Sequence, residues 1–263
     1  MTTTLDTIVA AARRRMAETG ARANRGELDR RAAEHVPRGF RQRLLERAAN
    51  GIAVIAELKK ASPSKGLIRA DFDPETLAPE LEAAGAAALS VLTDEQFFQG
   101  SLENLRLASA SVRIPCLRKD FLVDEWQLLE ARANGADAVL LIVAALQPGE
   151  LTALARRARE FKLDVLCEAH DEAELDRALD AGCDLIGVNS RDLRTFQVDL
   201  GTALRLAERI PAGVVKVAES GIHGAEDVRQ LRAAGYDAFL IGESLMKAER
   251  PGKALRELLG AGL

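Results

Sequence analysis

The chain has 263 residues, of which 48% are apolar and 29% are charged, and its formal net charge is −4. This length permits one large α/β barrel or two small domains, and a chain this long buries enough surface to fold without disulfides or metals. The ordinary globular composition excludes disordered and collagen-like chains, and the acidic balance does not favour a nucleic-acid surface.

The first 51 residues precede the first predicted strand. Apolar residues recur at helical spacing between Leu5 and Met16, and residues 37–51 predict another helix with Pro37 near its start and Gly51 after its end. We expect residues 1–51 to be an N-terminal helical extension that packs on the rest of the chain. Two roles remain open for it: a plug of the fold, or a wall of a substrate pocket.

Two features bear on the compartment. The basic cluster at 13–15 follows the first apolar stretch, which reverses the order of a secretory signal, and no apolar run approaches the ~20 residues of a membrane helix. Cys116, Cys167 and Cys183 are widely spaced, odd in number and without CxxC spacing, which argues against a disulfide framework or a zinc site. We therefore expect a cytoplasmic protein with no membrane partner, whose cysteines are small core residues in a reducing compartment.

A repeated plan runs through the rest of the chain. Gly85, Gly135, Gly182 and Gly235 each end an Ala-rich helical pattern and are followed almost at once by an apolar strand. Glycine suits the left-handed position after a helix, where a Cβ would be strained. The continuous apolar character of these strands is typical of a parallel sheet that helices cover on both faces.

A second set of apolar strands falls between those of the repeat, at 52–59, 114–121, 164–170 and 213–220. Together the two sets predict consecutive βα units in the number that closes a (β/α)8 barrel. An open doubly wound sheet is the alternative, but near-equal repeats favour closure. We expect residues 1–263 to form a single domain, a TIM barrel with an N-terminal helical extension.

Charged residues stand at the predicted carboxyl ends of the strands, where barrels of this kind hold their catalytic groups. Strand ends supply Glu57 with Lys59, then Lys119, Glu168, and Glu219 with Ser220; Asn189 ends an intervening strand. Because inward-facing layers draw on alternate strands, the carboxylates and Lys119 can converge near one mouth. We expect acid–base chemistry there, with a purely structural ion-pair cluster as the alternative.

Phosphate-binding signals follow the last two strands. Ser220-Gly221 and Gly242-Glu243-Ser244 occupy the loops that usually cradle phosphate in this fold, and the second opens a helix. We expect the Glu243 side chain to point away while its N–H faces the anion. The alternative is that Ser244 simply caps the helix.

Other candidates lie near the same mouth. The loop Lys59–Gly66, with Ser62, suits a phosphate or carboxylate, and Arg191 can hold a carboxylate at two points; a solvated loop is the alternative. His170 follows Glu168 as Glu-Ala-His, which resembles a metal pair. With no evident third ligand, we expect a loop histidine near an anionic ligand.

Several segments together resemble the indole-3-glycerol phosphate synthase family. They are IAELKKASPSKG (55–66), LRKDFLVDEWQLLEARANGADAVLLI (117–142), IGVNSRDL (186–193), VAESGI (217–222) and FLIGESLM (239–246). The resemblance implies a sugar-phosphate substrate, 1-(2-carboxyphenylamino)-1-deoxyribulose 5-phosphate. It also implies that the substrate is closed, decarboxylated and dehydrated to indole-3-glycerol phosphate in tryptophan biosynthesis, without cofactor or metal.

The resemblance also implies residue roles. It makes Lys119 the general acid for ring closure and Glu168 the base in dehydration. Lys59 is the lysine near the carboxylate and phosphate, and it is also proposed as the acid that expels the hydroxyl. Glu57 is the glutamate that orients these lysines. Asn189, Glu219 and Ser220 line the pocket, and Arg191 binds the substrate carboxylate. Phosphate contacts fall to Ser62, Gly221, Gly242 and the Glu243 amide.

Two other readings remain open. One is a related sugar-phosphate enzyme, either a phosphoribosylanthranilate isomerase or a lysine Schiff-base aldolase. The other is a non-catalytic barrel that binds an anionic metabolite. The pairing of Glu57 and Lys59 with Lys119 favours the synthase. We expect a monomer.

Overall fold

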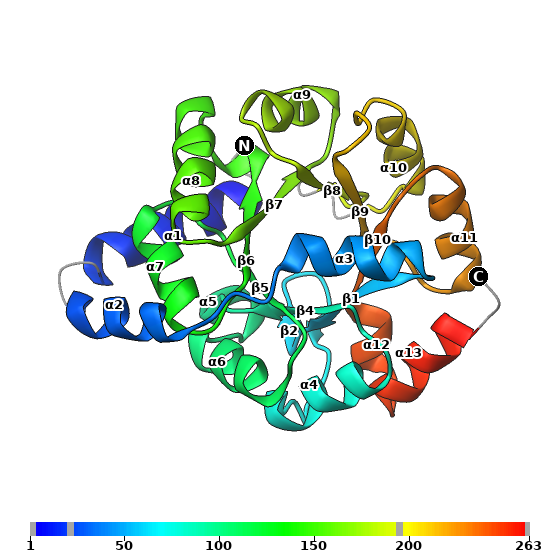
Figure 1. Cartoon of the computed structure of the whole chain (residues 1–263), viewed down its shortest axis with the longest axis horizontal. Coiled ribbons are helices and arrows are strands. Elements are labelled where there is room, and N and C mark those ends of the chain that lie inside the picture. Colours follow the sequence, from blue (N-terminus) through cyan, green and yellow to red (C-terminus); the bar gives the residue numbers. More distant parts are fainter. Residues whose placement is uncertain (1–3, 20–23, 193–196, 261–263) are drawn as a thin grey trace.

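A computed structural model describes residues 4–19, 24–192 and 197–260 (Figure 1). Parallel strands form a closed barrel in the order β1-β10-β9-β8-β7-β6-β5-β4, with β4 also paired to β1. The barrel strands are β1 (Ala53–Leu58), β4 (Ala88–Leu92), β5 (Cys116–Lys119), β6 (Ala138–Ile142), β7 (Asp164–Ala169), β8 (Leu185–Asn189), β9 (Val215–Glu219) and β10 (Ala238–Ile241). The predicted (β/α)8 barrel is therefore confirmed, and the open sheet is excluded.

Helices surround the barrel and alternate with its strands (Figure 1). They are α4 (Pro74–Ala83), α5 (Glu95–Phe98), α6 (Leu102–Ser111), α7 (Glu125–Ala133), the 3-10 turn η1 (Val143–Ala145), α8 (Pro148–Glu160), α9 (Glu172–Asp180), α10 (Leu200–Ala207), α11 (Ala225–Ala233), α12 (Glu243–Lys247) and α13 (Pro251–Gly260). Aspartate side chains cap many helix starts; Asp171, for example, accepts from the backbone N–H of Glu174. The repeat glycines have positive φ, as at Gly135 (84°), which confirms their predicted role.

Side chains inside the barrel come from every second residue of each strand, because successive side chains point to opposite faces. Ile55, Leu117, Leu166 and Val217 are buried within the inner apolar cluster. Two residues further along the same strands, the same face carries Glu57, Lys119, Glu168 and Glu219. The charged residues therefore stand on top of an apolar filling, at the carboxyl ends of the strands.

The N-terminal extension consists of α1 (Thr4–Thr19), α2 (Arg25–Glu34) and α3 (Phe40–Ala49). Helix α3 crosses one end of the barrel (Figure 1), and its fully buried Phe40 and Leu44 belong to the inner cluster. Helix α1 instead borders the pocket at the other end through Leu5 and Ile8. Both roles that the sequence left open are therefore present, on different helices.

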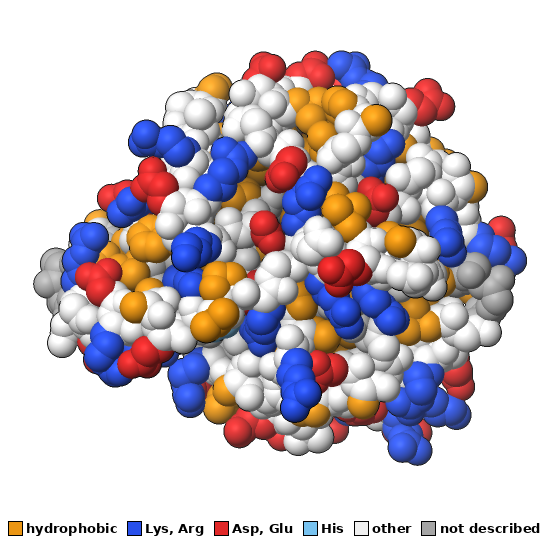
Figure 2. All heavy atoms as spheres, viewed as in Figure 1, with side chains coloured by type: hydrophobic (Ala, Val, Ile, Leu, Met, Phe, Trp, Pro, Cys, Tyr) orange, Lys and Arg blue, Asp and Glu red, His pale blue; other side chains and the backbone are white. Residues whose placement is uncertain are grey.

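Helix α2 was not predicted, because its sequence RGELDRRAAE has no apolar stripe. Its start is fixed by Asn24, whose side chain accepts from the Glu27 N–H. Ion pairs of Arg30 with Glu27 and Glu34 stabilise its exposed face. Figure 2 shows the same mixture of acidic and basic side chains over much of the face drawn.

The cysteine prediction was partly wrong. Cys116 is a free, buried core residue as expected, but Cys167 and Cys183 form a disulfide. Cys167 lies on β7 and Cys183 lies two residues before the start of β8, so the return of the chain through α9 brings their Cα atoms to 6.4 Å. Spacing motifs miss such a pair, because the fold and not the local sequence makes the two residues neighbours. In the described part of the chain, no helix is long and apolar enough to cross a membrane.

Candidate active site

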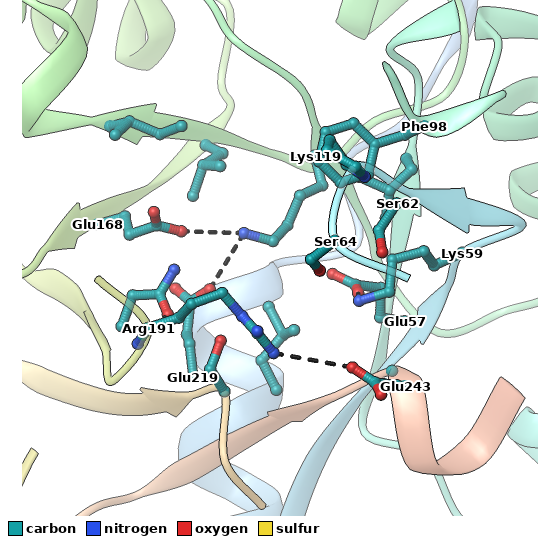
Figure 3. Close-up of a pocket in the computed structure, with 18 of the residues that line it drawn as sticks. Glu57, Lys59, Ser62, Ser64, Phe98, Lys119, Glu168, Arg191, Glu219 and Glu243 are labelled. Carbon is teal, nitrogen blue, oxygen red and sulfur yellow. Dashed lines mark hydrogen bonds and ion pairs between the residues drawn. The ribbon is translucent and has the colours of Figure 1, made fainter. Parts of the chain in front are cut away.

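A pocket opens at the carboxyl ends of the barrel strands (Figure 3), and Lys119 projects into it from the end of β5. Its Nζ lies 3.0 Å from Glu168 Oε2 on β7 and 3.1 Å from Glu219 Oε2 on β9. The two carboxyl side chains are only 2% exposed and that of Lys119 is 13% exposed, so water screens these charges little. One lysine is thus shared by two buried carboxyl groups.

Burial alone would lower the pKa of Lys119, but the carboxylates of Glu168 and Glu219 outweigh it and raise that pKa. Burial opposes ionisation of Glu168, yet Lys119 and His170 hold the pKa of Glu168 well below its usual range. Burial raises the pKa of Glu219 to about 8, and the Glu168 charge adds to the effect against the attraction of Lys119. The environments thus separate the carboxyls into an ionised one and one that holds a proton at neutral pH.

A second ion pair lies across the pocket. Glu57, on the inner face of β1, places Oε1 2.6 Å from the Nζ of Lys59, which follows the strand. Gly242 packs directly against this glutamate: a Cβ at position 242 would lie 2.4 Å from Glu57 Oε1. Glycine at this position is therefore required by the Glu57 side chain as well as by any close approach of a ligand to the backbone.

The loops after β9 and β10 face the same pocket. Ser220 and Gly221 are consecutive left-handed residues, with φ of 64° and 76°. The residue before α12 is Gly242, which has no side chain that could cap the helix. Ser244 Oγ instead lies 3.5 Å from the Ile222 carbonyl oxygen. Ser244 therefore does not cap α12, and the first-turn N–H groups of this helix border the pocket.

The expectation for the Glu243 side chain was wrong. Its carboxylate does not turn away, because cations surround it: Lys247 Nζ at 2.6 Å, Arg191 Nη2 at 3.7 Å and Lys65 Nζ at 3.8 Å. Burial opposes ionisation, but these lysines lower the pKa of Glu243. Figure 3 shows the Arg191–Glu243 ion pair spanning the mouth of the pocket. Asn189 holds the base of this arm, since its Oδ1 accepts from the Arg191 N–H at 3.0 Å.

His170 does not line the pocket, contrary to the expectation that it lies near an anionic ligand. Its ring nitrogens face two protein carboxylates instead. Its Nδ1 lies 2.9 Å from Glu174 Oε2, and its Nε2 lies 3.3 Å from Glu168 Oε1. Among the described residues, no group of three or more His, Cys, Asp or Glu side chains is arranged to hold a metal ion.

Comparison with known proteins decides the family. The family model described as indole-3-glycerol phosphate synthase matches residues 5–258. The chain belongs to the indole-3-glycerol phosphate synthase family. It is 62% identical to the indole-3-glycerol phosphate synthase of Koribacter versatilis, over 99% of this chain and 100% of that protein. It is 48% identical to indole-3-glycerol phosphate synthase 1 of Streptomyces coelicolor, over 98% and 95% of the two chains.

Solved structures of lower identity share the fold. The 3-hexulose-6-phosphate synthase of Salmonella typhimurium matches with a TM-score of 0.65 and 12% identity, over 80% of this chain and 97% of that one. The thiamine phosphate pyrophosphorylase of Pyrococcus furiosus matches with a TM-score of 0.60 and 19% identity, over 79% and 93%. At these identities the likeness establishes the barrel alone.

This one pocket is lined by every residue that the family resemblance selected, and also by Ser244. The selected residues are Glu57, Lys59, Ser62, Lys119, Glu168, Asn189, Arg191, Glu219, Ser220, Gly221, Gly242 and Glu243. The pocket also has an apolar wall that includes Leu5, Ile8, Phe98 and Phe121. Sequence reasoning left a wall role open for the helix that carries Leu5 and Ile8, but it missed Phe98 and Phe121. The Phe98 and Phe121 rings lie 6.1 Å apart between centroids. The motif KDF contains Phe121, so that residue could have been found. Which residues of α1 reach the pocket could not be decided from the sequence, because that depends on how α1 docks.

Proposed function

We propose that this chain converts 1-(2-carboxyphenylamino)-1-deoxyribulose 5-phosphate to indole-3-glycerol phosphate, with loss of one carbon dioxide and one water. The observation that carries this proposal is Lys119, held at the floor of the pocket between the buried carboxyl groups of Glu168 and Glu219. Such a lysine can deliver a proton to a carbonyl, which is what ring closure requires. As a member of its family, the chain is a carboxy-lyase of tryptophan biosynthesis.

The substrate has an aromatic ring at one end and a phosphate at the other, and the pocket has matching ends. The apolar wall of Leu5, Ile8, Phe98 and Phe121 takes the carboxyphenyl ring. The phosphate binds to the N–H groups of Gly221, Gly242 and Glu243 and to Ser62, with Ser220 and Ser244 adjacent.

Ring closure joins the aromatic carbon that bears the carboxylate to the former ketone carbon. Lys119 Nζ protonates the ketone oxygen as that bond forms, and the oxygen becomes a hydroxyl. Arg191, released from Glu243, and Lys59 then hold the carboxylate while its carbon–carbon bond breaks. The electron pair of that bond returns to the ring system as carbon dioxide leaves.

Dehydration completes the reaction. Lys59 donates a proton to the departing hydroxyl, which leaves as water, and Glu168 accepts the proton that the ring system must lose. Glu57 orients Lys59 through their 2.6 Å ion pair. Asn189 fixes the Arg191 backbone, and Glu219 holds Lys119 from the side opposite Glu168.

We also propose that the enzyme acts as a cytoplasmic monomer on a free small-molecule substrate, without metal, cofactor, nucleic acid or membrane. Support for the monomer is that both ends of the substrate site and its acid–base groups come from one chain. Support for the compartment is that the chain belongs to a family of biosynthetic enzymes that act on a small molecule.

Indole fluorescence tests the activity. Purified protein mixed with the proposed substrate, in the presence of a chelator, should produce indole-3-glycerol phosphate fluorescence, whereas Lys119→Met should produce far less. Borohydride added during turnover should leave no protein adduct, because protonation needs no imine. Folded protein that generates no indole contradicts the proposal, and a trapped adduct on Lys119 favours the aldolase reading.

A further inference from the structure

His170 follows β7 directly and contacts Glu168, but it is not among the residues that line the pocket. Its backbone N–H donates to Glu174 Oε2 at 2.9 Å, and its Nδ1 lies 2.9 Å from the same oxygen. Glu174 belongs to the first turn of α9, whose N-terminus Asp171 caps. One carboxylate oxygen of a neighbouring helix therefore holds both the backbone and the ring of His170.

The other ring nitrogen faces the Glu168 carboxyl. Nε2 is buried and lies 3.3 Å from Glu168 Oε1, close enough for an ion pair although the angle is not that of a hydrogen bond. The other oxygen of this carboxylate, Oε2, accepts from Lys119 at 3.0 Å. Each oxygen of Glu168 thus has a cation of its own, one that lines the pocket and one that does not.

We propose that His170 is a positioning residue: an imidazolium anchored by Glu174 that keeps Glu168 ionised and in place while Lys119 gives its proton to substrate. This inference rests on the proposed function of Lys119 and Glu168. His170 itself is not among the residues that line the pocket, so it acts only through Glu168.

The need for a second cation follows from the sharing of Lys119. When Lys119 loses its proton, Glu168 loses the positive charge 3.0 Å away, and its affinity for a proton rises. Without another cation, proton transfer from Lys119 to Glu168 would compete more strongly with transfer to substrate. A fixed imidazolium at 3.3 Å keeps that route unfavourable and preserves Glu168 as the base for the later step.

The charges that surround His170 support its protonation. Glu168 of β7 and Glu174 of α9 face its two nitrogens, Lys119 of β5 lies beyond Glu168, and η1, which contacts α9 and β7, has no charged residue. Burial would lower the pKa of His170, but the two glutamates outweigh it and raise that pKa to about 10.

The first experiment measures the imidazole directly and needs no catalysis. The chain has 3 histidines, so His170 can be assigned by comparing the imidazole NMR signals of wild type with those of His170→Gln. We expect the wild-type ring to stay protonated through pH 8, and Glu174→Gln to bring its titration down by one or more pH units. A wild-type His170 that titrates near or below its ordinary value overturns the proposal, whatever the protein catalyses.

The second experiment measures kcat and KM against pH for His170→Gln and Glu174→Gln. Loss of the cation should move the acidic limb of the kcat profile upward by roughly one to three pH units, with activity recovering in alkali and KM little changed. Glu172→Gln is the matched control, since it removes an exposed carboxylate from the same helix turn without touching His170. Its profile should follow wild type.

Each outcome of the kinetic experiment decides the role of His170 or of the proposed function. An upward shift in both His170→Gln and Glu174→Gln supports the proposal. An equal loss of kcat at every pH, accompanied by a lower melting temperature, assigns His170 a structural role and overturns it, as does an unchanged profile. If wild type lacks synthase activity, the proposed function fails, while the NMR titration still decides the state of His170.

Discussion

Lys119 is the residue on which most of the chemistry depends, and its replacement makes the sharpest test at the residue scale. Lys119→Met should lower kcat by about 10² to 10⁴-fold, the usual contribution of a general acid, while the fold survives. Steady-state indole fluorescence and a thermal melt measure both. A kcat within a few-fold of wild type contradicts a proton-donating role for this lysine.

The choice of control for Lys119 follows from the structure. Arg118, its neighbour, points outward and is buried, with Nη2 2.9 Å from Asp120 Oδ2 and Nη1 2.7 Å from the Gln127 carbonyl oxygen. Removing it takes the nearest cation away from the buried Asp120 and would lower stability for a reason unrelated to catalysis. Lys253→Met, which removes an exposed lysine of α13, is the better control and should leave kcat unchanged.

Glu219 predicts a pH-dependent stability. Its folded pKa, about 8 through burial and the Glu168 charge, is above its unfolded value of about 4.5. A folded state that binds the proton more tightly is stabilised below the unfolded pKa and loses that stabilisation as pH rises toward 8. Glu219→Gln abolishes this titration, so its melting temperature relative to wild type should rise between pH 4.5 and 8. A difference that is constant across this range would show that Glu219 ionises normally.

Individual contacts at the mouth were harder to predict than the residues that make them. The sequence placed Glu57, Lys119, Glu168 and Glu219 on one face, because strand alternation and strand ends are readable without coordinates. It did not reveal that Gly242 must accommodate Glu57, or that Glu243 pairs with Arg191. Those contacts join loops from distant parts of the barrel, and their geometry depends on how the barrel closes.

At the scale of elements, helix α1 is tied to the strand that carries Lys119. Arg15 Nη2 lies 3.4 Å from Asp120 Oδ1 and Nη1 lies 3.5 Å from Asp94 Oδ2. Asp120 in turn accepts from the Thr93 hydroxyl at 2.7 Å and from the Phe121 N–H at 2.8 Å. Burial opposes its ionisation, but Arg118 and Arg15 lower the pKa of Asp120. The network therefore holds α1, with its pocket-lining residues, over the ends of β4 and β5.

We expect Arg15→Met to weaken this docking and to raise KM roughly two- to fivefold, because a partly exposed ion pair contributes at most about 1 kcal/mol. The change in kcat should be smaller, since Lys119 keeps its own partners. Arg14→Met removes an equal charge from an exposed position of the same helix and serves as the control. Equal KM values for the two variants would mean that the Asp120 contact does not position α1.

The elements themselves were predictable to different degrees. Buried strands and the glycines after helices leave strong local signals, and every predicted barrel strand is present. Helix α2 and the short hairpin of β2 (Ala61–Ser62) and β3 (Gly66–Leu67) leave almost none, because one is polar and the other has two-residue strands. Both depend on neighbouring elements, α2 packing on α7 and the hairpin following the end of β1.

At the scale of the whole molecule, the N-terminal extension divides its work between the two ends of the barrel. Helix α1 borders the substrate pocket, whereas α3 seals the opposite end with Phe40 and Leu44. Helix α2 lies against α7, where Ala32 and Leu28 pack beside Trp126, Leu129 and Ala133. Substitutions in α1 should therefore affect substrate binding, and those in α3 should affect stability.

Phe40→Ala tests this division and the expectation that residues 1–263 unfold as one unit. The variant removes a fully buried ring and should cost about 3–5 kcal/mol, lowering the melting temperature by roughly 10 °C, while kcat/KM at 20 °C stays near wild type. Trp126, the 1 tryptophan of the chain, lies at the α2–α7 contact, so its fluorescence reports release of the extension. Far-UV circular dichroism reports the whole barrel. In a single cooperative unit the two signals change together, and Phe40→Ala shifts both equally. A fluorescence transition that precedes the loss of circular dichroism would instead make the extension a separate unit that docks onto a barrel able to fold without it.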